Sequence, residues 1–317
     1  MDDALISESL ASGQQLRRSG SLDPSCRDQM KKNKDGSCLI DVITAADMRV
    51  FIENKSLDLY SLQFKECPIG FDGCTMGGRN GVLTTDGIRS APDPKAEENG
   101  CADRIMRVQP EDQVIKTDEG EILEMTVRMN IPALSGQNLR FNRKIRILLS
   151  GSSIHWQDTV INPTSEPVSM FLLYDFNFGA PFLDPALQIY FPPGQVIPKT
   201  KESEKGLSEY NQMGEPIDGC PEQVFLHLPL PDSQVEKKVQ LVRSDLQIAL
   251  VLSWSSETLP FLVQRKRLKT GDYTLGIQLA ASQIERQARK GEDESFQELK
   301  PFDQKAYHLS LELLSLT

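Results

Sequence analysis

The chain has 317 residues, a formal net charge of −10 and a pI near 5.0. Its Lys and Arg residues are scattered through alternating segments, so the sequence predicts no nucleic-acid partner. No apolar run approaches the roughly 20 residues of a membrane-spanning helix, and the N-terminal segment lacks the basic-then-apolar pattern of a secretion signal. We therefore expect a soluble, cytoplasmic protein with no membrane partner.

The first 37 residues differ in composition from the rest of the chain. They are rich in Ser, Asp, Gln and Lys and have no apolar period. Such a segment buries too little surface to offset the entropy lost on ordering. The sequence thus predicts a disordered polar tail over residues 1–37, followed by one large domain over residues 38–317.

From residue 38 onward, apolar residues recur with a period of two. The four clearest faces are Leu123, Met125, Val127, Met129 and Ile131; Leu139, Phe141, Ile145, Ile147 and Leu149, interrupted by Arg143; Leu246, Ile248, Leu250, Leu252 and Trp254; and Tyr307, Leu309, Leu311 and Leu313. This pattern is typical of half-buried antiparallel strands. Because turns rather than helices separate the strands, the expected fold is a large all-β sandwich.

Two segments depart from this pattern. Residues 280–289 contain a Glu285/Arg289 pair and end near Gly291, which predicts a short surface helix. Residues 198–222 are charged, contain Gly and Pro, and are too long for a simple hairpin connection. They are either a lid or rim loop beside a site or an ordinary mobile surface loop.

The cysteines and histidines give no sign of a metal or cofactor. The six cysteines form no CxxC pair, and no His/Cys/carboxylate cluster has ligand spacing. Reduced thiols are expected, although Cys67 and Cys74 could lie close enough to bridge. Of the three histidines, His155 and His308 are expected to be structural residues of strands.

The segment Leu172–Pro181 is the most informative part of the chain. Strand alternation puts Asp175 and Asn177 on one face, within a run that is otherwise apolar or aromatic. A carboxylate and an amide in such surroundings need hydrogen-bond partners. Either the hydroxyls of a sugar or nearby backbone groups at a strand end would supply them.

Several segments in the same order resemble an aldose 1-epimerase-like family of uncharacterised proteins in the galactose mutarotase-like superfamily. They are Leu57–Lys65, Gly81–Ile88, Tyr174–Pro181, Pro221–His227 and Gly271–Gly276. The resemblance implies a galactose mutarotase-like β-supersandwich of mostly antiparallel strands with a sugar site on its concave face. Related mutarotases use a His acid and a Glu base there.

The chain departs from that family at the positions where the family usually has its His and Glu residues. Asp175 stands where the family has His, Ala102-Asp103-Arg104 replaces a His-Gly-Arg string, and Gln278 stands where Glu is usual. A Gln cannot accept a proton as a base. Each positioned acid or base is typically worth about 10²- to 10⁴-fold in rate, so we expect reduced or lost epimerase activity.

We expect binding of a monosaccharide or sugar derivative to persist. The residues expected to bind it are Arg104, Asn177, Glu222, Arg265, Lys266 and Gln278. Arg265 and Lys266 could instead belong to a solvated charged strand. The enzyme alternative is an aldose 1-epimerase or isomerase using Asp175, His227 and Glu222, and a third possibility is an interaction protein with a vestigial cleft. The sequence leaves the identity of the sugar and the oligomeric state open.

Overall fold

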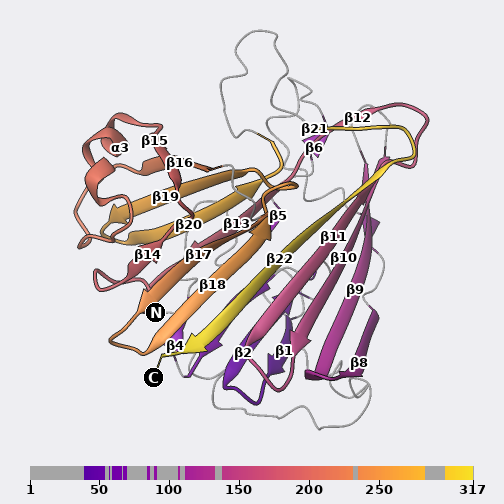
Figure 1. Ribbon diagram of the computed structural model, residues 1–317, viewed down its shortest axis with the longest axis horizontal. Helices are drawn as coiled ribbons and strands as arrows, with labels where there is room; N and C mark the ends of the chain where they lie inside the picture. The colour runs from indigo at the N-terminus through magenta and orange to yellow at the C-terminus, as the bar shows by residue number, and fades with distance from the viewer. Residues whose placement is uncertain are drawn as a thin grey trace.

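The computed structural model describes residues 39–53, 57, 59–65, 67–69, 84–85, 89–90, 106–107, 111–132, 138–230, 235–282 and 297–316. Most of these residues lie in strands, arranged in two large sheets and two small ones (Figure 1). Strand pairs in both large sheets are antiparallel. The expected all-β fold is therefore confirmed.

The larger sheet has nine strands. Their order is β14 (Gln188–Tyr190), β17 (Glu236–Arg243), β18 (Ile248–Ser255), β22 (Gln304–Ser315), β11 (Ser153–Ile161), β10 (Asn138–Leu148), β9 (Gly120–Pro132) and β7 (Met106–Arg107), with β8 (Glu111–Thr117) also paired to β9. The second sheet has six strands, in the order β15 (Gly194–Pro198), β16 (Gln223–Pro229), β19 (Phe261–Lys269), β20 (Asp272–Ala280), β13 (Leu173–Phe178) and β5 (Thr84–Thr85).

Two smaller sheets and a short helical segment complete the described residues. One sheet contains β1 (Leu39–Ile43), β2 (Met48–Glu53), β3 (Leu59–Phe64) and β4 (Cys67–Pro68), and the other β21 (Gln297–Leu299), β12 (Val168–Phe171) and β6 (Arg89–Ser90). The helices are α3 (Lys201–Lys205) and the 3₁₀ turn η2 (Leu207–Glu209). No helix in the described part of the chain has the length and apolar character needed to cross a membrane.

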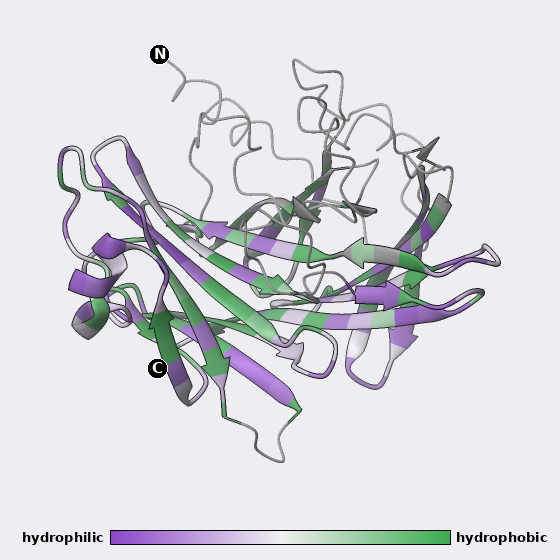
Figure 2. Ribbon diagram, turned by 90° about the horizontal axis from the view of Figure 1, so that it is seen from above, coloured by the Kyte–Doolittle hydropathy of each residue, from purple (hydrophilic) through white to green (hydrophobic). Residues whose placement is uncertain are grey.

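The period-two segments form the strands that the sequence predicts. Hydrophobic and hydrophilic bands alternate along them in Figure 2, because successive side chains point to opposite faces. One boundary differs: β18 begins at Ile248, and Leu246 lies in the preceding turn with its side chain exposed.

The predicted helix over residues 280–289 is wrong where the structure describes it. Ala280 ends strand β20, paired with Leu173 and Phe261, and residues 281–282 form a bend. The apolar period of two that runs through Leu275, Ile277 and Leu279 holds this end of the predicted helix in the sheet. Residues 283–289, like the predicted tail over residues 1–37 and Cys74, lie outside the described residues.

The two large sheets meet through buried side chains. Trp156 of β11 and Phe176 of β13 contact edge to face, with ring centroids 6.1 Å apart. Beside them lies an ion pair that is fully buried: Arg143 of β10 donates from Nη2 to Oδ2 of Asp158 at 2.7 Å. Arg143 thus interrupts the apolar pattern of its strand because it pairs with Asp158 on the neighbouring strand.

The same carboxylate binds the six-stranded sheet. The Tyr174 hydroxyl of β13 donates to Oδ2 of Asp158 at 2.8 Å. Burial and the nearby Asp158 raise the pKa of Tyr174 well above its usual value, so the phenol stays a neutral donor. One buried carboxylate therefore holds a cation from its own sheet and a hydroxyl from the opposite sheet.

Replacing this carboxylate is expected to destabilise the fold strongly. Asp158→Ala should lower the free energy of unfolding by about 3–5 kcal/mol, because it leaves the buried Arg143 guanidinium without this partner. Tyr174→Phe should cost less, about 1–3 kcal/mol. Urea denaturation measures both. Glu236→Ala is the control, because Glu236 pairs with Lys238 at 2.9 Å on the exposed surface, where an ion pair contributes less than about 1 kcal/mol.

Candidate functional site

Strand β13 presents two polar side chains on the face of the six-stranded sheet that points away from the core. Tyr174, Phe176 and Phe178 are buried on the inner face, whereas Asp175 and Asn177 alternate with them and are half-buried. The expectation that Asp175 and Asn177 share a face agrees with this arrangement. We call this side of the sheet the front face and the opposite side the rear face.

The neighbouring strands bring further polar residues to the front face. On β20, Gln278 pairs with Asp175 and Gly276 pairs with Asn177. On β19, Arg265 pairs in turn with Gly276. Residues paired directly across a sheet point to the same face, so Asp175 and Gln278, which lie 103 positions apart in the sequence, become neighbours.

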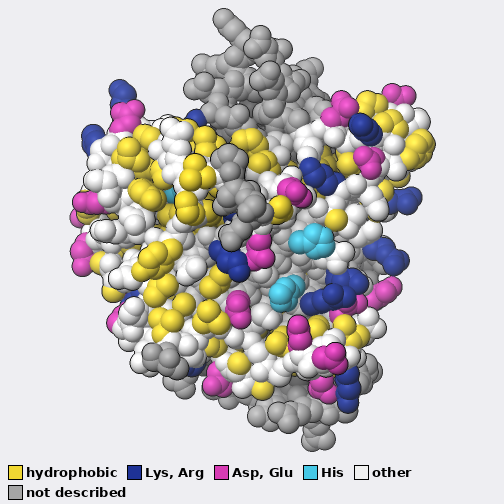
Figure 3. Space-filling model, in the orientation of Figure 1, with side chains coloured by type: hydrophobic (Ala, Val, Ile, Leu, Met, Phe, Trp, Pro, Cys, Tyr) yellow, Lys and Arg dark blue, Asp and Glu magenta, His cyan; other side chains and the backbone are white. Residues whose placement is uncertain are grey.

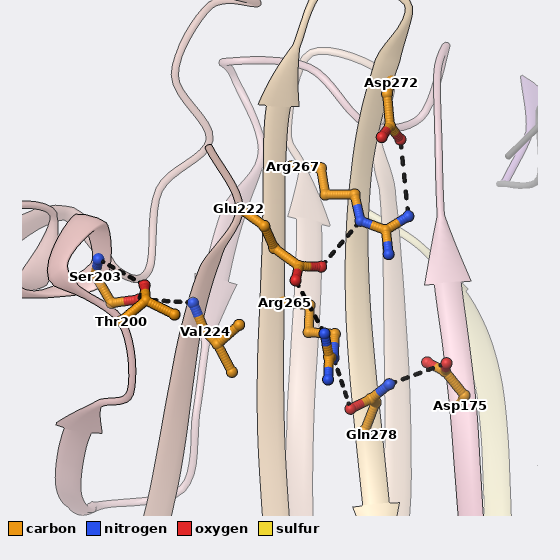
Figure 4. Close-up of polar contacts among 9 residues, drawn as sticks. All are labelled: Asp175, Thr200, Ser203, Glu222, Val224, Arg265, Arg267, Asp272 and Gln278. Atoms are coloured by element: carbon orange, nitrogen blue, oxygen red, sulfur yellow. Dashed lines mark hydrogen bonds and ion pairs between the residues drawn. The ribbon is translucent and has the colours of Figure 1, made fainter. Parts of the chain in front are cut away.

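A continuous row of contacts connects these side chains (Figure 4). Gln278 donates from Nε2 to Oδ2 of Asp175 at 3.0 Å and accepts at Oε1 from Nε of Arg265 at 3.1 Å. Arg265 then donates from Nη1 to Oε2 of Glu222 at 2.9 Å. The amide of Gln278 is thereby fixed in one orientation, because its donor and its acceptor each face a charged group.

Glu222, just before β16, extends the row to a second arginine. Its Oε1 accepts from Nε of Arg267 at 2.9 Å, and Nη1 of Arg267 lies 3.8 Å from Oδ1 of Asp272. We call these six residues the polar network: Asp175, Gln278, Arg265, Glu222, Arg267 and Asp272. Arg267 and Asp272 were not among the residues predicted to bind a ligand. The two-residue spacing from Arg265 to Arg267 is the signal that puts both on one face.

Gly276 allows the polar side chains to approach one another. A Cβ atom at this position would lie 3.2 Å from Oδ1 of Asn177, 3.4 Å from Cβ of Arg265 and 3.7 Å from Oδ1 of Asp175. The three side chains therefore close over a position that has no side chain of its own. A glycine in a strand interior often marks such a close approach, of backbone or of a ligand.

Two of the predicted site residues lie on the rear face. His227 of β16 and Lys266 of β19 are buried on the side opposite to the polar network. The reason is strand parity: Lys266 follows Arg265 directly, so the two side chains point in opposite directions. The structure thus brings Asp175, Asn177, Gln278, Arg265 and Glu222 to one face but not His227 or Lys266. Arg104 lies outside the described residues.

Both rear-face residues have neutral partners. Nε2 of His227 lies 3.1 Å from Oε1 of Gln264, and the ring stacks on Phe191 with centroids 4.0 Å apart. Burial lowers the pKa of His227 to about 4. Lys266 donates from Nζ to the Glu209 carbonyl at 2.8 Å, and burial lowers its pKa to about 8.

The segment 199–222 covers this rear face. Gln264 donates from Nε2 to the Tyr210 carbonyl at 2.7 Å, which fixes η2 and its following turn to β19. Thr200 caps α3 by accepting from the Ser203 amide at 3.1 Å, and the Ser203 hydroxyl accepts from the Val224 amide at 2.6 Å (Figure 4). These contacts attach the segment behind the sheet, and its last residue, Glu222, reaches the front.

The remaining histidines lie in the other large sheet, not in the sheet of the polar network. His155 of β11 and His308 of β22 are exposed on the outer face of the nine-stranded sheet. Figure 3 shows histidine, basic and acidic side chains interspersed on the face of the molecule that it displays. Within the residues that the structure describes, no group of three His, Cys, Asp or Glu side chains could hold a metal ion.

These elements match a known sequence family and a known fold. The family described as "Domain of unknown function (DUF4432)" matches residues 72–313. The chain belongs to this family. No curated protein is similar enough in sequence to match it.

Solved structures resemble the DUF4432 chain in fold. A protein provisionally named aldose 1-epimerase from Klebsiella pneumoniae has a TM-score of 0.72 at 16% identity, over 88% of this chain and 80% of that one. A galactose mutarotase related enzyme from Lactobacillus acidophilus has a TM-score of 0.62 at 12% identity, over 88% and 98%. A galactose 1-epimerase from the same species has a TM-score of 0.60 at 11% identity, over 96% and 100%. The galactose mutarotase-like fold expected from the sequence is thus confirmed.

Replacing Gly276 should disturb the front face more than the fold. Gly276→Ala requires Asn177 and Arg265 to move by a few tenths of an ångström. The lower entropy of the unfolded chain offsets part of this cost, so the free energy of unfolding should change by less than about 1 kcal/mol. NMR spectra should show shifts of the Asn177 and Gln278 side-chain amides. Unchanged amide signals would contradict the close approach.

The buried His227 should make stability depend on pH. Its folded pKa of about 4 lies below the value of about 6.5 in the unfolded chain, so the unfolded state binds the proton first as the pH falls. The contribution of His227 to the free energy of unfolding is fully present above pH 6.5. It is lost as the pH falls toward 4, by roughly 3 kcal/mol. Urea denaturation at several pH values should give a smaller loss for His227→Gln. Equal losses in the two proteins would show that His227 is not the group responsible.

Proposed function

We propose that this protein binds a monosaccharide or a sugar derivative on the front face of the six-stranded sheet. The observation that carries the proposal is the polar network, in which donors and acceptors alternate across three neighbouring strands and the start of a fourth. A sugar ring presents adjacent hydroxyls that each donate and accept. Asn177 and Gln278 can do both, Asp175 and Glu222 accept, and Arg265 donates.

The fold is also consistent with sugar binding, because proteins of similar fold carry names that refer to sugars. The similar structures include proteins whose names refer to aldose 1-epimerase, galactose 1-epimerase or galactose mutarotase. Folds host many functions and sites carry the chemistry, so the argument depends on the side chains of the front face. Those side chains suit a polyhydroxylated ligand better than an apolar one.

We propose that catalysis is weak or absent. Opening an aldose ring requires proton donation to the ring oxygen and proton removal from the anomeric hydroxyl, by two groups that flank one carbon. Gln278 cannot take a proton, and His227 lies on the opposite face of the sheet. Both of the usual partners are therefore missing from the described part of the front face.

One observation favours a second candidate, an aldose 1-epimerase that works with substituted residues. Asp175 is an ionisable group that lies with Asn177 over Gly276, on the same face as Gln278. A carboxyl group there could act as an acid or a base toward a bound sugar. Such an enzyme would show a bell-shaped dependence of rate on pH.

A single NMR experiment with a panel of neutral aldoses separates these functions. Saturation transfer reports binding, and exchange between anomers reports catalysis. Wild-type protein is expected to give saturation transfer without faster anomeric exchange, and Asn177→Ala should weaken binding by roughly fivefold because each hydrogen bond to a ligand is worth about 1 kcal/mol. The control is Gln240→Ala on β17 of the nine-stranded sheet, which should bind as the wild type does.

Two results would change the proposal. Accelerated exchange that Asp175→Asn abolishes while binding persists would establish the epimerase. If no aldose gives saturation transfer or raises the melting temperature, the sugar proposal fails, because a ligand that binds only the folded state must stabilise it. An interaction protein with a vestigial cleft would then be favoured.

A further inference from the structure

The polar network contains two arginines that share one carboxylate. Arg265 Nη1 and Arg267 Nε each lie 2.9 Å from a different oxygen of Glu222. Their side chains are about one-third exposed, at 32% and 33%, and that of Glu222 is 30% exposed. All three are therefore within reach of a ligand on the front face.

The two arginines stand at alternate positions of one strand, which is a donor arrangement that an external anion would also use. A guanidinium has five N–H donors in a fixed plane, and pairs of such donors match the oxygens of carboxylates and phosphates. Glu222 already occupies the matching position from within the chain. An incoming carboxylate or phosphate would have to compete with it.

The charge of the network also opposes an anion. It contains three carboxylates, on Asp175, Glu222 and Asp272, and two guanidiniums, on Arg265 and Arg267, so its formal charge is −1. Without Glu222 the formal charge would be zero, and both guanidiniums would lose their shared acceptor. Glu222 thus determines both the net charge of the network and the availability of its donors.

We propose that Glu222 is a specificity-determining residue that excludes sugars carrying a phosphate or carboxylate and restricts the site to neutral sugars. This inference rests on the proposed sugar binding. Glu222 holds the two guanidiniums in place as hydrogen-bonded partners of the network, so Arg265 presents its remaining N–H groups to hydroxyl oxygens. The residue discriminates by charge while leaving the neutral hydrogen-bonding surface intact.

Glu222→Gln tests the inference directly. The change removes the negative charge and leaves a single acceptor oxygen for two guanidiniums. Titration calorimetry should compare glucose and galactose with their 6-phosphates and with glucuronate and galacturonate. In wild-type protein the anionic sugars should bind at least about tenfold more weakly than the neutral ones, and in Glu222→Gln this gap should shrink by roughly tenfold.

Three further proteins control the result. Glu222→Asp keeps the charge and should keep the exclusion of anions. Glu312→Gln removes an exposed carboxylate of β22 in the nine-stranded sheet, with the same change in net charge, and should bind like wild type. In the double variant Glu222→Gln with Arg265→Gln, the gain in affinity for anionic sugars should be lost. The gain should also decrease with added salt, because these groups are partly exposed.

The outcomes separate this inference from the proposed function. If wild-type protein binds 6-phosphates or uronates as tightly as neutral sugars, Glu222 does not exclude anions, and sugar binding itself stands. A gap that is the same in wild type and Glu222→Gln also overturns the role of Glu222. If neither protein binds any sugar of the panel, sugar binding fails, and the specificity inference fails with it.

Discussion

A buried carboxylate determines which side chains this protein presents on the front face. Asp158 binds Arg143 within the nine-stranded sheet and accepts from Tyr174 of the six-stranded sheet. Because the side chains of a strand alternate, an inward Tyr174 makes Asp175 and Asn177 point outward. A slip of β13 by one residue would bury the carboxylate and the amide and expose the aromatic residues. The polar contacts inside the core thereby set the arrangement of the site outside it.

Local sequence patterns predicted the strands and the two faces of β13. The alternation of apolar and polar side chains can be recognised from residues that are adjacent in the sequence. The same parity separates Arg265 from Lys266, and applying it to β19 would have excluded Lys266 from the front face. The pairing of Asp175 with Gln278, 103 positions later, follows from the order of strands in the sheet. No local pattern encodes that order. Four of the six residues of the polar network, Asp175, Gln278, Arg265 and Glu222, were therefore predicted as residue types but not as contacts.

The two faces of the six-stranded sheet make different contacts although the same strands form both. The rear face buries His227, Gln264 and Lys266. Gln264 and Lys266 donate to backbone carbonyls of the segment 199–222, and His227 contacts the side chain of Gln264. His227 and Lys266 were predicted to belong to a site when only the sequence was known. Their burial instead serves to fix a long connection that has little regular structure. Polar residues of one strand can thus hold a connection on one side and form part of the polar network on the other.

The contact between Gln278 and Asp175 means that a single base change could put two carboxyl groups side by side on the front face. Glutamine and glutamate codons differ only in their first base, and a glutamate at this position would put a second carboxyl group about as near to Asp175 as the present amide, whose Nε2 is 3.0 Å from Oδ2. Two carboxyl groups at that distance repel each other when both are ionised, which favours a shared proton, whereas Arg265 beside them favours ionisation. The fold could therefore acquire or lose a proton-transferring pair through a single point mutation, with the surrounding sheet unchanged.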